Sequence, residues 1–353
     1  MHRRQFLRST AAAAASLAGL PARSRAAAGQ LMTVTGPMAA DAAGLMLPHE
    51  HIMVSLSVPG PFDAARPDLP ERYRYDRDEV VRVALPHVRA AASAGVRTLA
   101  EATPAFLGRD PLVLKRLSEV SGVRILTNTG YYGARDDQHL PPHARTESAD
   151  ALAARWTREF RDGIGDTGVR PGFIKIGVDP GRLSDIDAKL VRAAARTHRA
   201  TGLAIACHTG PAVAARDVLS VVEDEGVPPD AWIWVHAQAE SDLEAHVEIA
   251  RRGAWVEFDG VGPDSLERHA ALVLNLRRRG LLARVLISHD AGWYRIGEPG
   301  GGEFRGFTVL VEEFLPALRK SGLGEEEIRQ LTHENPARAY GVRPGSDRGQ
   351  TGA

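Results

Sequence analysis

The sequence has almost no cysteine, no long apolar run and no excess of charge of one sign. Cys207 is the only cysteine among 353 residues, which excludes an intramolecular disulfide framework and a cysteine-rich zinc module. No apolar run reaches the roughly 18–20 residues that a membrane-spanning helix requires, so no membrane partner is expected. Lys and Arg together number 44, as do Asp and Glu. Net charge therefore gives no reason to expect a nucleic-acid partner.

Residues 1–28 are typical of an export signal. Arg3 and Arg4 precede an apolar stretch over 11–20, and three small residues follow at 26–28. A basic start, a short apolar core and a small-residue cleavage site predict secretion, and the arginine pair predicts the twin-arginine machinery and a periplasmic or secreted location. The alternative is an ordinary basic N-terminus. Without these residues the chain keeps 39 basic and 44 acidic side chains, which again argues against a polyanionic partner.

Short stretches rich in apolar and β-branched residues alternate with amphipathic ones along the chain. Strands are predicted at 44–49, 96–102, 123–129, 173–178, 203–208, 232–236, 255–258 and 285–289. Helices are predicted at 77–94, 149–163, 186–201, 241–252, 265–279 and 308–321, another from Glu325, and a short separate one from Asn335-Pro336. Eight alternating units predict a single-domain α/β fold, a (β/α)8 barrel over 29–342. A disordered tail is expected over 343–353.

Residues that bind metals in proteins recur at the ends of these predicted strands, where such barrels carry their active sites. They are His49, His51, Lys175, His208, His236 and Asp290. The last four are separated by 33, 28 and 54 residues, which matches one, one and two units of roughly 30 residues each. A single histidine at a strand end is usually a packed or solvated residue, but six such residues together predict a metal centre.

Lys175 stands out because it lies within an apolar strand, where a bare ammonium would be costly to bury. Reaction of its amine with carbon dioxide would give a carbamate, an anionic group whose two oxygens can bridge two cations. Four imidazoles and a carboxylate suit zinc, and also manganese, cobalt or iron. The sequence therefore predicts two divalent metal ions, with zinc favoured, bridged by carboxylated Lys175.

These motifs resemble the phosphotriesterase branch of the amidohydrolase superfamily over nearly all of 44–341. The motifs that carry the resemblance are His49-Glu50-His51, Gly172-Phe173-Ile174-Lys175-Ile176, Cys207-His208-Thr209-Gly210, Val235-His236-Ala237-Gln238 and Ser288-His289-Asp290. The resemblance implies that His49, His51 and Asp290 hold the more buried ion, that His208 and His236 hold the other, and that homodimers form. It also implies that Tyr132 lies over the metals. Trp293, near the start of the long loop 291–307, is predicted to bind substrate with it.

The predicted site indicates a hydrolase of a small-molecule ester. Two cations would lower the pKa of a shared water, the resulting hydroxide would attack the substrate, and Asp290 would take the proton. The first hypothesis is a lactone or related ester; the alternative is an organophosphate triester. A non-catalytic binding barrel would be expected to lose ligands, and a barrel that acts on nucleic acid or bases conflicts with Lys175 and the acidic chain.

The sequence departs from the family in the predicted proton path. An aspartate is usual shortly after the sixth-strand histidine, but Gln238 and Ala239 stand there, and Gly260 replaces a histidine or arginine. Asp290 is therefore expected to release its proton to solvent directly or through Asp259.

Several other residues are given ordinary roles. Cys207 and His289 are expected to pack, and Glu101 is expected to support His49 or His51. Six further histidines are expected to be solvated, on helices or in the loop after the third strand: His87, His198, His246, His269, His139 and His143.

Overall fold

A computed structural model describes residues 29–55, 60 and 73–343 of the chain. The predicted export signal and residues 344–353 of the predicted tail lie outside the described residues. The strands are β1 Gln30–Thr33, β2 Gly36–Ala39, β3 Leu45–Val54, β4 Val96–Glu101, β5 Arg124–Leu126, β6 Asn128–Thr129, β7 Phe173–Gly177, β8 Ile205–His208, β9 Trp232–Val235, β10 Trp255–Phe258, β11 Val285–Ile287 and β12 Gly292–Arg295.

The α-helices follow the strands in alternation. They are α1 Arg77–Ser93, α2 Pro111–Ser121, α3 Pro142–Thr146, α4 Ala149–Asp162, α5 Asp185–Thr201, α6 Ala212–Asp224, α7 Leu243–Arg251, α8 Leu266–Arg278, α9 Leu315–Lys320, α10 Glu325–Arg329 and α11 Asn335–Tyr340. Within the described ranges, none of these helices combines the length and apolar character that a membrane crossing requires.

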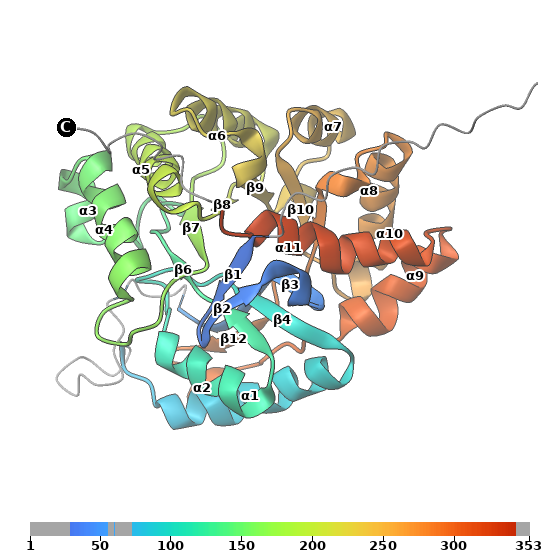
Figure 1. Ribbon diagram of the computed structural model, residues 1–353, viewed down its shortest axis with the longest axis horizontal. Coiled ribbons are helices and arrows are strands. Elements are labelled where there is room, and N and C mark those ends of the chain that lie inside the picture. The colour runs from blue at the N-terminus through green and yellow to red at the C-terminus, as the bar shows by residue number, and fades with distance from the viewer. Residues whose placement is uncertain (1–28, 56–59, 61–72, 344–353) are drawn as a thin grey trace, which may run out of the picture.

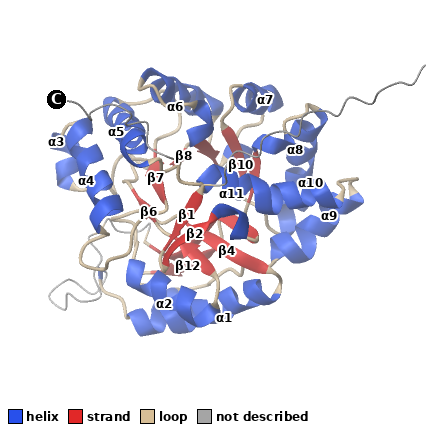
Figure 2. Ribbon diagram, viewed as in Figure 1, coloured by secondary structure: helices blue, strands red, loops and turns tan. Residues whose placement is uncertain are grey.

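Parallel strands form a closed barrel, which confirms the predicted fold. One sheet has the order β11-β10-β9-β8-β7-β6 and the other the order β12-β3-β4-β5. Only Thr127 separates β5 from β6. At the opposite edge, the His49 N–H donates to Ser288 Oγ at 3.0 Å and the Asp290 N–H donates to the His49 carbonyl at 3.2 Å. The two sheets therefore join at both edges, and helices surround the strands (Figures 1 and 2).

The end of the barrel opposite the predicted site is closed by apolar packing. Leu31 of β1 and Tyr340 of α11 belong to the same buried cluster as Phe173 and Ile233 inside the barrel. The Tyr340 hydroxyl donates to the carbonyl of Pro48 at 2.7 Å. Figure 1 shows α11 and the β1–β2 hairpin lying over the strands at this end. The interior of the barrel can therefore be reached only from the end where the strands have their C-termini.

Helix boundaries follow local sequence signals. The Asp110 side chain accepts hydrogen bonds from the backbone N–H groups of Leu112 and Val113, and Pro111 occupies the first turn of α2. The helix ends at Gly122, whose φ of 76° is left-handed. In α5, Ser184 and Asp187 form a reciprocal capping box.

The eight predicted strands all occur, but the first and the third differ from the prediction, and β1, β2 and β12 were not predicted. The first strand runs to Val54, because β12 pairs with it in parallel and aligns Gly292 with His51. This additional strand lies inside what the sequence indicated to be loop 291–307. The predicted third strand is two short strands separated at Thr127.

The short helix predicted from Asn335-Pro336 is confirmed as α11, but it continues from the preceding helix instead of standing apart. A π-helical turn over Gln330–Glu334 joins α10 to α11, and the backbone remains right-handed helical through both junctions. Pro336 follows this turn, as Pro316 follows a second π-helical turn over Leu310–Phe314. Proline lacks an N–H and its ring crowds the preceding turn, so a wider turn ahead of it lets the helix continue.

The histidines of the helices were predicted to be solvated, and three of them are buried. One ring nitrogen of each lies within hydrogen-bonding distance of a backbone carbonyl: His198 with Leu203 at 2.7 Å, His246 with Ala237 at 2.8 Å and His269 with Ser265 at 2.9 Å. His87 is half-buried and stacks on Phe304. A neutral imidazole tolerates burial when a carbonyl oxygen accepts a hydrogen bond from its N–H. A helix position that faces inward can therefore hold histidine. Cys207 packs in the same layer, as predicted.

Gly130, directly after β6, approaches the backbone that carries Lys175. A Cβ at this position would lie 2.1 Å from the Lys175 carbonyl oxygen, and φ is +119°. We expect Gly130→Ala to lower the free energy of unfolding by about 2–4 kcal/mol, because it adds both backbone strain and overpacking. Gly226→Ala is the control: φ is +74° but nothing lies within 4 Å of its Cβ, so about 1 kcal/mol is expected. Equal losses in urea denaturation would contradict the close approach at Gly130.

Candidate metal centre

The six predicted ligands converge at the C-terminal mouth of the barrel. His49 and His51 lie on β3, Lys175 on β7 and His208 at the end of β8; His236 directly follows β9, and Asp290 lies three residues beyond β11. The imidazole rings are close neighbours: their centroids are 5.4 Å apart for His49 and His51, 5.2 Å for His49 and His236, and 4.5 Å for His208 and His236. Side chains from five strands thus face one small volume.

The donor atoms of His49, His51 and Asp290 fit a cation. One atom of each lies within 4.8 Å of the others. His51 Nε2 is 3.0 Å from Asp290 Oδ1, yet Oδ1 has no hydrogen-bond partner among the described residues, nor has the buried His49 Nε2. Unpaired buried polar atoms are costly, and a shared divalent ion would satisfy both. The chemistry of these donors suits zinc.

In three of the histidine rings, Nδ1 lies within hydrogen-bonding distance of an oxygen atom. His51 Nδ1 is 2.7 Å from Thr103 Oγ1, and His236 Nδ1 is 2.7 Å from Asp259 Oδ1. His49 Nδ1 is 3.1 Å from Glu257 Oε2 and 3.4 Å from Asp259 Oδ2. Histidines that bind metals typically donate their other N–H in this way. The arrangement leaves the Nε2 atoms available to ions.

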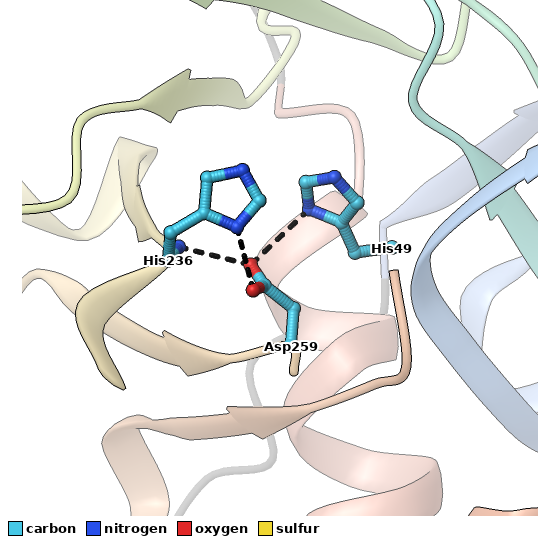
Figure 3. A group of neighbouring side chains, drawn as sticks. All are labelled: His49, His236 and Asp259. Carbon is cyan, nitrogen blue, oxygen red and sulfur yellow. Dashed lines mark hydrogen bonds and ion pairs between the residues drawn. The ribbon is translucent and has the colours of Figure 1, made fainter. Parts of the chain in front are cut away.

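Asp259 orients two of these rings at once. Figure 3 shows its carboxylate lying between His49 and His236 and facing Nδ1 of both. The Gln238 side-chain amide also donates to Asp259 Oδ1, at 2.6 Å. His49, His236 and Asp259 are close enough to surround an ion themselves, but their hydrogen bonds already occupy the atoms that would hold it. We therefore interpret Asp259 as an orienting group.

Burial and charge favour the ligand forms of His49, His208 and Lys175, whereas Asp259 favours the protonated form of His236. Burial, then the neighbouring Lys175 and histidines, hold the pKa of His49 and of His208 well below the usual value, so these rings are neutral. Burial alone would lower the pKa of His236, but Asp259 raises it. Burial lowers the pKa of Lys175, which favours the neutral amine that can react with carbon dioxide.

Two of the predicted ligands are among the non-glycine residues with positive φ, as is Trp293 beside them. His236 has φ of 60° and Asp290 has φ of 54°, a left-handed conformation that ordinary residues rarely adopt. Such strain costs on the order of 1–3 kcal/mol and tends to occur at functional sites. His236 directly follows β9, and Asp290 lies three residues beyond β11, so both side chains lie at the C-terminal mouth of the barrel.

Tyr132 and Trp293, the predicted substrate-binding residues, form part of the wall of the site. The Tyr132 hydroxyl lies 3.3 and 3.4 Å from the ring nitrogens of His208. The Trp293 ring is 5.1 Å from that of His51, and its indole N–H donates to the Asp290 carbonyl at 2.9 Å. Both side chains pack with the apolar residues Val54, Leu107 and Ala134.

The acidic residues near His49 and His51 face different ways. Glu101 accepts hydrogen bonds from the N–H groups of Ile52 and Thr103 at 3.1 and 3.3 Å, so its support of His51 passes through Thr103. Glu50 points away from the site and accepts from Ser288 Oγ at 2.8 Å, and it lies 2.6 Å from His289 Nδ1. The packing role predicted for His289 is confirmed.

Sequence reasoning missed Thr103 and Glu257. It named Asp259 but missed its role in orienting the histidine rings. Glu257 and Asp259 stand two residues apart at the end of an apolar strand, so they share a face. That alternation was a usable signal. Thr103 lies in an ordinary stretch after β4, and nothing in the sequence distinguishes it. His139, predicted to be a solvated loop residue, is buried beside Tyr132, and burial lowers its pKa to about 4.

Comparison with known proteins gives a consistent result. The model of the phosphotriesterase family matches residues 29–340. The chain is 29% identical over 307 residues to the phosphotriesterase homology protein of Escherichia coli K12, covering 86% of this chain and 100% of the relative. It is 27% identical over 309 residues to the aryldialkylphosphatase of Saccharolobus solfataricus, covering 84% and 95%.

A solved structure is also similar over most of the chain. It comes from the molecular engineering of organophosphate hydrolysis activity from a weak promiscuous lactonase template. The TM-score is 0.77 and the identity 28%, covering 88% of this chain and 100% of that chain.

The contact between Thr103 and His51 makes metal affinity testable. We expect Thr103→Val to weaken zinc binding about 10–100-fold, because the His51 ring loses the group that fixes its orientation. The measurement is competition with a chromophoric chelator. Thr127→Val is the matched control, because Thr127 is buried and its hydroxyl has no partner among the described residues. Unchanged affinity in Thr103→Val would contradict a ligand role for His51.

Proposed function

The chain belongs to the phosphotriesterase family of hydrolases, and from that premise we propose that it uses two divalent metal ions to hydrolyse a lactone or a related ester. The observation that carries this proposal is the convergence of His49, His51, His208, His236 and Asp290 on one mouth of the barrel. Cations would satisfy the unpaired donor atoms there.

We propose the following division of ligands. His49, His51 and Asp290 would hold one ion, His208 and His236 would hold the other, and carboxylated Lys175 would be a ligand to both. In the modification, Lys175 Nζ forms a bond to the carbon of carbon dioxide and releases a proton, which leaves an anionic carbamate. When bound, zinc or a similar ion supplies a strong nucleophile from water at neutral pH and polarises the substrate oxygen.

Asp290 is suited to move a proton out of the site. Its side chain is 25% exposed and faces the mouth. Asp259, the other candidate for a proton path, is fully buried and engaged with His236 and Gln238. Of the two routes that the sequence left open, direct release from Asp290 to solvent therefore has the better support.

The wall formed by Tyr132 and Trp293 offers a hydrogen-bond donor to a substrate oxygen. Burial raises the pKa of Tyr132, so its hydroxyl remains a hydrogen-bond donor at neutral pH. That hydroxyl lies beside His208 and can orient a carbonyl oxygen there. An organophosphate triester is the second candidate, supported by the similarity to an aryldialkylphosphatase.

We also propose that the protein is exported in folded form and acts in the periplasm or outside the cell. The support is the arginine pair and apolar stretch within residues 1–28. Export after folding would allow the metals to be loaded beforehand. A homodimer remains a proposal from family resemblance alone.

The proposed chemistry predicts a ratio of rates. Zinc- or manganese-loaded protein in bicarbonate buffer is expected to hydrolyse lactones at least tenfold faster than an aryl dialkyl phosphate, and Lys175→Ala is expected to lose both activities together with one equivalent of metal. A lactone panel, the phosphate and elemental analysis give the comparison. Faster phosphate turnover would favour the second candidate, and silence on both would reject the substrate class.

The position of Tyr132 predicts a selective loss of activity. Tyr132→Phe is expected to lower kcat/KM for lactones about tenfold, because a hydrogen bond to the substrate is lost, with bound metal unchanged. Tyr131→Phe serves as the control, since the neighbouring hydroxyl pairs with His143 instead. Equal behaviour of the two variants in steady-state assays would remove Tyr132 from the substrate site.

A further inference from the structure

Arg305 is held at the edge of the metal centre by its backbone. Its N–H donates to the Gly292 carbonyl at 2.8 Å, and the Gly292 N–H donates back to the Arg305 carbonyl at 3.0 Å. This pair of hydrogen bonds brings together the two ends of the segment 292–305. Gly292 aligns with His51 in the β12–β3 pairing, so Arg305 is connected to a strand that carries two predicted ligands.

The Arg305 side chain lies over the wall of the site. Its guanidinium donates a hydrogen bond to the backbone carbonyl of Asp290 and lies 5.8 Å from the centre of the Trp293 ring. The same Trp293 ring is 5.1 Å from the His51 ring. A cation therefore stands one side chain away from a predicted metal ligand, and it contacts the backbone of Asp290 rather than its carboxylate.

The charge of Arg305 has no carboxylate partner among the described residues. Arg295, in the same segment, pairs with Glu298 at 3.4 Å. The buried carboxylates nearest the metal centre, Glu257 and Asp259, are directed at histidines. A guanidinium carries five N–H donors. The hydrogen bond to the Asp290 carbonyl comes from one guanidinium nitrogen and leaves other donors available. Arg305 is exposed, so the others can meet a substrate.

A guanidinium supported by an aromatic face is well suited to bind a carboxylate, because its planar donors match two oxygens and its hydration is weak. The position matters as much as the chemistry. A substrate whose reacting carbonyl lies at the ligands would extend along Trp293 and reach Arg305 with its far end.

We propose that Arg305 and Trp293 form a subsite for a carboxylate, so that the preferred substrate is a lactone or ester that carries a carboxylate away from the reacting carbonyl. The inference rests on the proposed hydrolase function and narrows its substrate class. Within the proposed class of lactones and related esters, it selects the anionic ones.

The test compares two matched compounds on the metal-loaded protein. One is a γ-butyrolactone with a carboxylate on the ring, and the other is its neutral N-methylamide. We expect Arg305→Met to raise KM for the carboxylate about tenfold and KM for the amide less than twofold, because one charged interaction is lost. Arg295→Met, in the same segment, is the control and should change neither. Added salt should weaken binding of the carboxylate to the wild type but not to Arg305→Met.

Several results would overturn the subsite. The wild type could show no preference for the carboxylate, or Arg305→Met could raise KM equally for both compounds. Either result would leave Arg305 with only the role of holding the loop. Tighter binding of a sulfonate analogue would reject the carboxylate assignment. If neither lactone is hydrolysed, the proposed function fails, and dissociation constants from calorimetry then decide the role of Arg305 by the same comparison.

Discussion

The centre of the barrel depends on one constraint: a buried imidazole must satisfy both of its nitrogens. In His49, His51 and His236, one nitrogen lies against an oxygen of Thr103, Glu257 or Asp259. Each hydrogen bond fixes the tautomer and the rotation of a ring and thereby directs the other nitrogen into the mouth. The groups that orient the rings are themselves buried, in β10 or just after a strand.

Most of the barrel could be predicted from the sequence. Strands buried on both faces produce continuous apolar runs, and their alternation with amphipathic helices indicates parallel order. The convergence of His208, His236 and Asp290 followed from their regular spacing, because every unit of the barrel returns the chain to the same end. Such features depend on local pattern and on a repeating architecture.

The missed features depend on contacts between distant parts of the chain. The pairing of β12 with β3 needs a strand more than 200 residues earlier, and no local pattern in Gly292–Arg295 reports it. Thr103 matters only because His51 lies beside it. The helix histidines were wrongly predicted for a similar reason. The sequence does not show which carbonyl will accept a hydrogen bond from the ring, as the Leu203 carbonyl does from His198. The repeating pattern of strands and helices can be predicted from the sequence, whereas the contacts of individual side chains depend on tertiary packing.

The carbonyl of Asp290 has a consequence for how this protein can diversify. It accepts hydrogen bonds from both Trp293 and Arg305, so the residue proposed to offer its carboxylate to a metal also holds the two side chains proposed to contact the substrate. A lineage that altered this wall to accept a new compound would at the same time shift a metal-binding group. Selection for substrate range and selection for metal retention therefore act on the same few atoms, and mutations in this segment should survive mainly in compensating pairs.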